Sequence, residues 1–196
     1  MTDQPKFEAT GSISSTSDQL TNVLLDGICG DIRFALKHGR NRSALILIFS
    51  GIDAMASLEK NDGKNDVRER FANWVNEYMQ FGDWPEAGLE LYGARCGILH
   101  TYGPISNLFE KGQVRLIGYT SGDGRDVIQS AELVLVSVEG LAFQFFRGIA
   151  RYLESLLSEP TKRAKAAPRI QQMYQEFDLN TELAPSFEDV SVTTNK

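Results

Sequence analysis

The stretch Ala94-Arg95-Cys96-Gly97-Ile98-Leu99-His100-Thr101-Tyr102 decides the fold prediction, because it ends a helical pattern and gathers reactive side chains. It holds one of the two histidines in the 196-residue chain, five positions after Arg95 and two before Tyr102. Gly103-Pro104 follows, and proline cannot continue a helix. We therefore predict a helix that ends near His100, with arginine, histidine and tyrosine side chains around its last turn.

The rest of the chain is dominated by the same helical periodicity. Apolar residues recur at helical spacing in six segments, approximately 17–39, 42–60, 65–81, 86–100, 139–156 and 168–177. The second of these is apolar on most sides, and its small residues would let neighbouring helices approach closely. These segments predict a mainly α fold built as an antiparallel helical bundle.

Two short segments between the fourth and fifth helices break this periodicity. Residues 113–119 and 133–138 are rich in branched side chains, and the loop Ser121-Gly122-Asp123-Gly124 lies between them. Such a pattern is typical of a β-hairpin, predicted here over about 113–138. We expect one domain over residues 17–178, with flexible polar tails at 1–16 and 179–196.

Composition limits the classes of function. The formal charge of −6 argues against broad coating of nucleic acid, although it permits a local basic cleft. Two basic clusters, Lys37 to Arg42 and Lys162 to Arg169, each fit a solvated helix end when taken alone. No apolar run is long enough to span a bilayer, and the polar N-terminus has no signal-peptide core. Cys29 and Cys96 lack metal-ligand spacing, so we expect free thiols in a cytoplasmic protein.

The spacing between Arg95 and His100 has a geometric consequence. At about 100° per residue, a five-residue step rotates the side chain by ~140° around the helix. We therefore expect the two side chains to flank a stripe on which Cys96 and Leu99 face inward. One copy would make a poor catalytic pair, whereas two copies around a twofold axis could surround one cleft.

These residue types suit phosphodiester chemistry. The Arg95 guanidinium presents a fork of donors that matches phosphate oxygens, and His100 can transfer a proton near neutral pH. No metal-ligating spacing lies nearby, so chemistry without a metal or cofactor is expected. In RNA, the 2′-hydroxyl could attack the adjacent phosphate. On spacing alone, a structural role for both side chains remains open.

The motif Arg95-x4-His100-x-Tyr102, at a helix end before a Gly-Pro turn, resembles the HEPN superfamily. It is most similar to the R-x4-H-x-Y form of HEPN toxins that are paired with minimal-nucleotidyltransferase antitoxins. The longer string Leu91 to Tyr102 also resembles a group of uncharacterised bacterial HEPN-like proteins. The resemblance covers residues 18–158 and implies a HEPN-like helical bundle.

The resemblance also implies a function. In that family, arginine and histidine from two protomers form a metal-independent endoribonuclease site, which maps onto Arg95 and His100. Tyr102 maps onto a tyrosine that contacts substrate or is adenylylated by a nucleotidyltransferase antitoxin. The implied protein is a homodimer that cleaves RNA, as a toxin or a phage-defence effector.

Two further residues bear on this site. Asp53 lies in an otherwise apolar helix and could orient Arg95 across the bundle, although a local hydrogen bond or partial exposure would also explain it. Cys96 stands where active family members usually carry a polar residue. The alternative function is therefore a catalytically weak or inactive HEPN-like module that binds RNA, nucleotide or a partner protein. A nuclease requires an open, locally positive cleft, whereas a closed cleft or salt-bridged arginines would favour the binding module.

Overall fold

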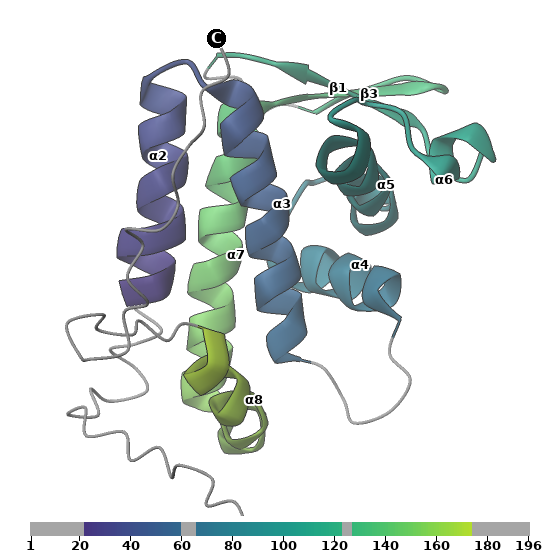
Figure 1. Ribbon diagram of the computed structural model, residues 1–196. Coiled ribbons are helices and arrows are strands. Elements are labelled where there is room, and N and C mark those ends of the chain that lie inside the picture. Colours follow the sequence, from purple (N-terminus) through teal and green to yellow (C-terminus); the bar gives the residue numbers. More distant parts are fainter. Residues whose placement is uncertain (1–21, 60–65, 123–126, 174–196) are drawn as a thin grey trace, which may run out of the picture.

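The computed structural model describes residues 22–59, 66–122 and 127–173, and these form a mainly helical fold with one small sheet (Figure 1). A π-helical segment, Asn22–Ile28, leads into α2 (Cys29–Lys37), and α3 (Asn41–Leu58) follows after a tight turn. Gly39 makes this turn at a φ of +65°, a conformation that costs glycine little. The predicted start of the first helix at residue 17, both predicted tails and Asp123-Gly124 lie outside the described residues.

The middle of the chain forms α4 (Val67–Tyr78), α5 (Ala87–Thr101) and the short α6 (Asn107–Glu110). The Asp66 carboxylate accepts a hydrogen bond from the Arg68 amide and so caps the start of α4. The predicted helices over 65–81 and 86–100 are thus confirmed, each with small shifts at the ends. The sequence patterns gave no sign of α6.

The long helix α7 (Val138–Ser158) is followed directly by α8 (Pro160–Met173). The prediction that the last helix begins at Pro168 is wrong, because Pro168 lies inside α8. Pro160 occupies the first helical position instead, where the missing N–H costs nothing.

Helices α2, α3 and α7 stand side by side, while α4 and α5 lie across them (Figure 1). The antiparallel arrangement predicted for the bundle holds for α2 and α3, but α3 and α7 run in the same direction (Figure 1). The chain returns through α4, α5 and the sheet, so α7 starts from the same end as α3. The HEPN-specific bundle thus remains an expectation.

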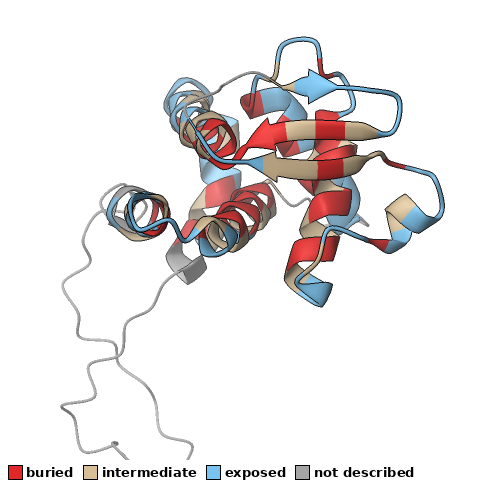
Figure 2. Ribbon diagram, turned by 90° about the horizontal axis from the view of Figure 1, so that it is seen from above, coloured by how far each residue is buried: buried red, intermediate tan, exposed pale blue. Residues whose placement is uncertain are grey.

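Buried residues line the surfaces where these helices meet (Figure 2). Close contact between α3 and α7 depends on Gly51, because a Cβ there would lie 2.4 Å from the Phe145 ring. Small residues in this segment were predicted to let neighbouring helices approach closely, and Gly51 does so. The largest fully buried side chains are Trp74, Tyr152, Phe49, Phe71 and Phe145.

The sheet corrects the predicted hairpin. Strands β1 (Leu116–Thr120) and β3 (Leu133–Ser137) pair in parallel, with Leu116 opposite Leu133, and β2 (Ile128–Gln129) pairs antiparallel with β3. The strand order is β1-β3-β2. The two segments predicted as the strands of the hairpin, β1 and β3, are therefore neighbours, but they run in the same direction. The antiparallel hairpin is formed by β2 and β3 instead. Alternation of branched residues predicts a strand and carries no information about its direction.

Across the described segments, no helix combines the length and the hydropathy that a bilayer-spanning helix needs.

Candidate active site

The site lies on the last two turns of α5. Its inward face is made by Leu91, Ala94 and Ile98, which recur at helical spacing and are buried. Leu99 is partly buried and packs against the hydrophobic core, as predicted. Cys96 is also partly buried but lines a surface pocket, so the prediction that it faces inward is wrong. The buried stripe passes through Ala94 and Ile98 and leaves these two residues at its margins.

Arg95 and His100 are direct neighbours within one chain. Arg95 Nη1 lies 3.1 Å from His100 Nε2. The prediction that one copy would leave the two side chains apart is wrong, because it considered only the angle of about 140° between their Cα–Cβ directions. The long arginine side chain carries its guanidinium around the helix to the imidazole.

Asp53 fixes the other side of the same guanidinium. Its Oδ2 atom accepts hydrogen bonds from Arg95 Nε at 2.8 Å and lies 2.7 Å from Nη2. The side chains of Arg95 and Asp53 are only 17% and 23% exposed, so the ion pair is well shielded from water. The predicted contact across the bundle, from α3 to α5, is confirmed.

This ion pair governs the charge of Arg95. Burial alone would lower the pKa of the guanidinium, but the hydrogen bonds and the charge of Asp53 outweigh it and raise the pKa above its ordinary value. Arg95 is therefore a cation at neutral pH, as guanidinium groups in proteins are. The second carboxylate oxygen, Asp53 Oδ1, is buried and has no hydrogen-bond partner among the described residues.

The Arg95–His100 contact has one chemically possible direction as a hydrogen bond. Arginine has donors and no acceptor, so Nε2 of His100 is the acceptor in it. An imidazole nitrogen that accepts from a neighbouring cation can take up a proton once that cation moves to another partner.

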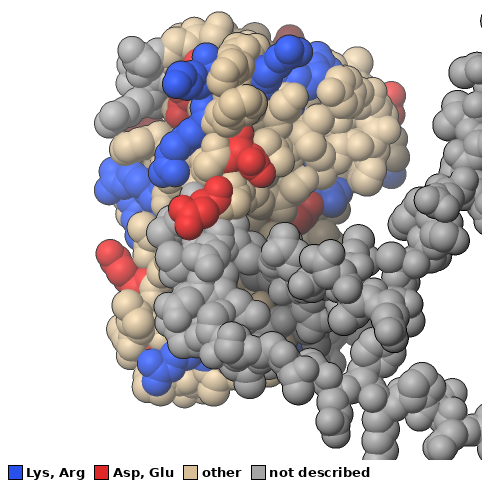
Figure 3. Space-filling view, turned by 60° about the vertical axis from the view of Figure 1, so that its left-hand side comes forward, with Lys and Arg blue, Asp and Glu red and all other residues tan. Residues whose placement is uncertain are grey.

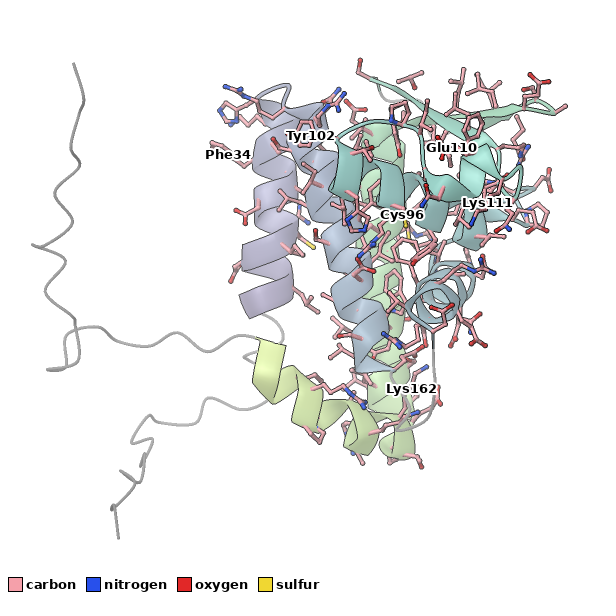
Figure 4. The ribbon with its side chains drawn as sticks, turned by 45° about the vertical axis from the view of Figure 1, so that its right-hand side comes forward. Phe34, Cys96, Tyr102, Glu110, Lys111 and Lys162 are labelled. Carbon is pink, nitrogen blue, oxygen red and sulfur yellow. The ribbon has the colours of Figure 1, made fainter. Side chains whose placement is uncertain are left out.

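An open pocket of about 390 Å³ adjoins this group. Cys96, His100 and Thr101 of α5 form one wall, and the segment from Ile105 to Glu110 forms the other. Figure 4 shows Cys96 and Glu110 on this side of the molecule. The segment can pass close under α5 because of Gly97, where a Cβ would lie 2.7 Å from the Gly103 carbonyl oxygen.

Two properties of the site bear on the criteria set from the sequence. The pocket is open, as a nuclease site requires, but Glu110 is its charged lining residue and Arg95 does not line it. Arg95 forms a salt bridge with Asp53, and a salt-bridged arginine is the feature expected of the binding module. A single chain thus has the open pocket that a nuclease requires but not its local positive charge, and it has the salt-bridged arginine that favours the binding module.

Tyr102 ends α5 on the far side of His100. It adopts a left-handed conformation with a φ of 57°, and its side chain is 58% exposed (Figure 4). The Arg42 guanidinium lies 5.0 Å from the centre of the Tyr102 ring, and its Nη1 donates a hydrogen bond to the Tyr102 carbonyl. The sequence gave Arg42 only as part of a basic cluster; its contact with Tyr102 joins residues 60 positions apart.

The other histidine has a local role. His38 Nδ1 donates to the Phe34 carbonyl oxygen at 2.8 Å, at the end of α2. Within the described ranges, no group of three or more His, Cys, Asp or Glu side chains is placed to hold a metal ion.

Comparison with known proteins gives no family for the chain: no family model matches it, and neither the curated proteins nor the solved structures compared include a match. The functional argument therefore rests on the residues of the site.

Proposed function

We propose that the chain is a metal-independent endoribonuclease of HEPN type, acting as a toxin or a phage-defence effector through a site shared by two protomers. The observation that carries the proposal is the contact between Arg95 and His100, with Asp53 anchoring the arginine from α3. This arrangement brings a cation held by Asp53 and an imidazole together beside an open pocket. The resemblance of the Arg95-x4-His100-x-Tyr102 motif to HEPN toxins supports the same function.

The chemistry follows from the two side chains. A phosphate of single-stranded RNA draws Arg95 Nη1 away from His100, and the freed Nε2 accepts the proton of the 2′-hydroxyl. The 2′-oxygen then bonds to phosphorus while the bond from phosphorus to the 5′-oxygen breaks. The leaving 5′-oxygen takes a proton from water, and His100 releases the proton it accepted to solvent, so the enzyme returns to its starting state. Arg95 offsets the negative charge that gathers on the phosphate oxygens. The products are a 2′,3′-cyclic phosphate and a 5′-hydroxyl.

A second candidate function is favoured by one observation. Asp53 engages two of the three guanidinium nitrogens of Arg95, so only the Nη1 hydrogens and one Nη2 hydrogen remain for a phosphate unless the ion pair opens. A catalytically weak HEPN-like module that binds RNA, nucleotide or a partner protein would tolerate this restraint.

The test compares the wild-type chain with His100→Ala in an RNA cleavage assay that contains EDTA. We expect the wild type to cut defined RNAs and to leave 2′,3′-cyclic phosphate ends, and we expect His100→Ala to lose at least about 100-fold in rate, the lower range for a general acid or base. An RNA with 2′-deoxy substitution at the cut site should resist the wild type.

Arg163→Gln is the control, since it removes an exposed side chain on α8, outside both the site and its pocket. It should cut like the wild type and impair growth equally when expressed. Equal cleavage by the wild type and His100→Ala would eliminate the nuclease function. Binding of RNA without cleavage by any of the three proteins would establish the second candidate.

Tyr102 has the proposed role of substrate contact or of modification by a nucleotidyltransferase antitoxin. Its exposed side chain supports access for either. Co-expression with a cognate transferase should add the mass of AMP to the peptide that contains Tyr102, and Tyr102→Phe should prevent this.

A further inference from the structure

The end of the bundle formed by the α2–α3 turn concentrates positive charge. Residues 33–42 contain four lysines and arginines, a histidine and no acid, in a chain whose net charge is −6. Among these, Lys37, Arg40 and Arg42 are exposed. Figure 3 shows Lys and Arg atoms gathered over the upper part of the face on which α2 lies. The tight turn at Gly39 brings the cations of two helices to one end.

Two aromatic rings are exposed at the same end (Figure 4). The Phe34 side chain is 65% exposed and that of Tyr102 is 58% exposed. The His38 ring lies against Phe34 with centroids 4.1 Å apart, and the Arg42 guanidinium lies over Tyr102. Each ring is therefore held in place on one side by a basic group and is open to solvent on the rest of its surface.

This aromatic-basic end, defined as Phe34, Lys37, Arg40, Arg42 and Tyr102, is continuous with the candidate site. Arg42 donates to the Tyr102 carbonyl, and Tyr102 is two residues beyond His100.

We propose that the aromatic-basic end binds single-stranded RNA and leads it to His100, with Phe34 and Tyr102 stacking on bases and Lys37 and Arg40 contacting phosphates. Stacking rings alongside a positively charged path are the features by which proteins hold single strands without reading their sequence. The proposal deepens the proposed function, on which its account of substrate delivery rests, and the binding itself is measurable without cleavage.

The arrangement favours RNA over an anionic membrane. Membrane binding by an exposed surface depends on a broad apolar face next to cations. Here the two exposed rings belong to different helices, and each is in contact with its own basic group. In a duplex the base faces are stacked on one another, so paired RNA cannot use the rings.

The binding assay uses the full chain carrying His100→Ala, with EDTA, and a short fluorescein-labelled oligouridine bearing 2′-O-methyl groups that prevent attack on phosphorus. Fluorescence anisotropy gives the affinity. We expect Phe34→Leu to weaken binding at least about fivefold, the loss typical of one base–aromatic stack. Arg40→Gln should lower the slope of log affinity against log salt by about 0.7, the value for one phosphate contact on a single strand.

The matched controls lie on α7 and α8. Leu157→Ala removes another exposed apolar side chain, which is 76% exposed, and Arg163→Gln removes another exposed arginine. Both should bind like the parent protein. Thermal unfolding of every variant checks that a loss of binding is not a loss of fold.

Three outcomes overturn the proposal: unchanged binding in both Phe34→Leu and Arg40→Gln, equal affinity for duplex RNA, or binding of phosphatidylserine vesicles in place of oligouridine. Weakened binding in these variants, from a chain that cuts no RNA, supports this surface and refutes the nuclease. Cleavage that needs His100 but is unchanged in both variants supports the nuclease and refutes this surface.

Discussion

At the scale of single residues, Arg95 is the centre of the site because all three of its nitrogens have partners. Two face Asp53 and the third faces His100. The sequence pointed to Arg95 and His100 as site residues and to Asp53 as a partner for Arg95. It did not predict the direct Arg95–His100 contact, because the helical angle gives the direction of each Cα–Cβ bond and not the length of the side chain.

The Arg95–Asp53 pair should behave as one unit in unfolding. Arg95→Ala leaves a shielded carboxylate without its cation, and Asp53→Ala leaves the cation alone, so each should lower the free energy of unfolding by about 1–3 kcal/mol. The double variant should lose less than the sum, with a coupling energy of about 0.5–3 kcal/mol. Urea denaturation of the four proteins measures this, and strictly additive losses would show that the ion pair is energetically unimportant.

The two cysteines should differ sharply in reactivity. Cys29 is 1% exposed, and desolvation raises the pKa of its thiol to about 11 despite the nearby charge of Arg33. Cys96 lines the open pocket beside His100. Brief treatment of the folded protein with iodoacetamide should therefore modify Cys96 and spare Cys29, as read by peptide mass spectrometry. Modification of both thiols at one rate would contradict the described burial.

At the scale of elements, a buried carboxylate on α5 binds Arg115, the residue that precedes strand β1. Glu90 of α5 is 4% exposed; it accepts hydrogen bonds from Arg115 Nε and Nη2 at 2.7 and 2.8 Å, and from the Trp84 indole. Burial alone would raise the pKa of Glu90, but Arg115 and Trp84 outweigh it and hold the pKa below its ordinary value of 4.5.

This attachment should be lost in acid. A carboxyl group whose pKa is lowered by folding stabilises the protein above its ordinary pKa and loses that contribution as pH falls towards its folded pKa. The free energy of unfolding of the wild type should fall as pH drops below 4.5. Glu90→Gln should be less stable at neutral pH and should show a smaller decrease over the same acid range. Identical pH profiles from urea titrations would exclude this role for Glu90.

The helices were more predictable than the sheet, for a physical reason. Local signals such as the cap at Asp66 and the glycine at position 39 place helix ends, and the period of the apolar residues identifies the buried face. Strand pairing between β1 and β3 depends on where the chain crosses back, which no local pattern encodes. The start of the last helix was predicted at Pro168 because proline suits the first helical position. Pro160 has the same property, and α8 begins there instead.

At the scale of the whole molecule, the proposed nuclease is a pair of chains, and this can be tested by mixing inactive variants. Arg95→Ala and His100→Ala should each be inactive. A heterodimer of the two keeps one arginine and one histidine, on different chains, and should recover measurable cleavage if the site is shared.

The control for this mixture is a chain that carries both substitutions, mixed with either single variant. It should recover nothing. A mixture of the single variants that also remains inactive, although light scattering shows a dimer, would mean that the Arg95–His100 contact must form within one chain.

The left-handed backbone conformation of Tyr102 costs conformational free energy that a glycine at the same position would avoid. Helices commonly end on glycine in this conformation, and any other residue there loses roughly 1–2 kcal/mol. Glycine follows at position 103, so a shift of one residue would have relieved the strain. The chain instead places an exposed aromatic ring there, and among the described residues Tyr102 is the one non-glycine residue with a positive φ. Replacing Tyr102 by glycine should therefore stabilise the fold against heat, and on the proposed function it would also weaken the surface that delivers RNA to His100.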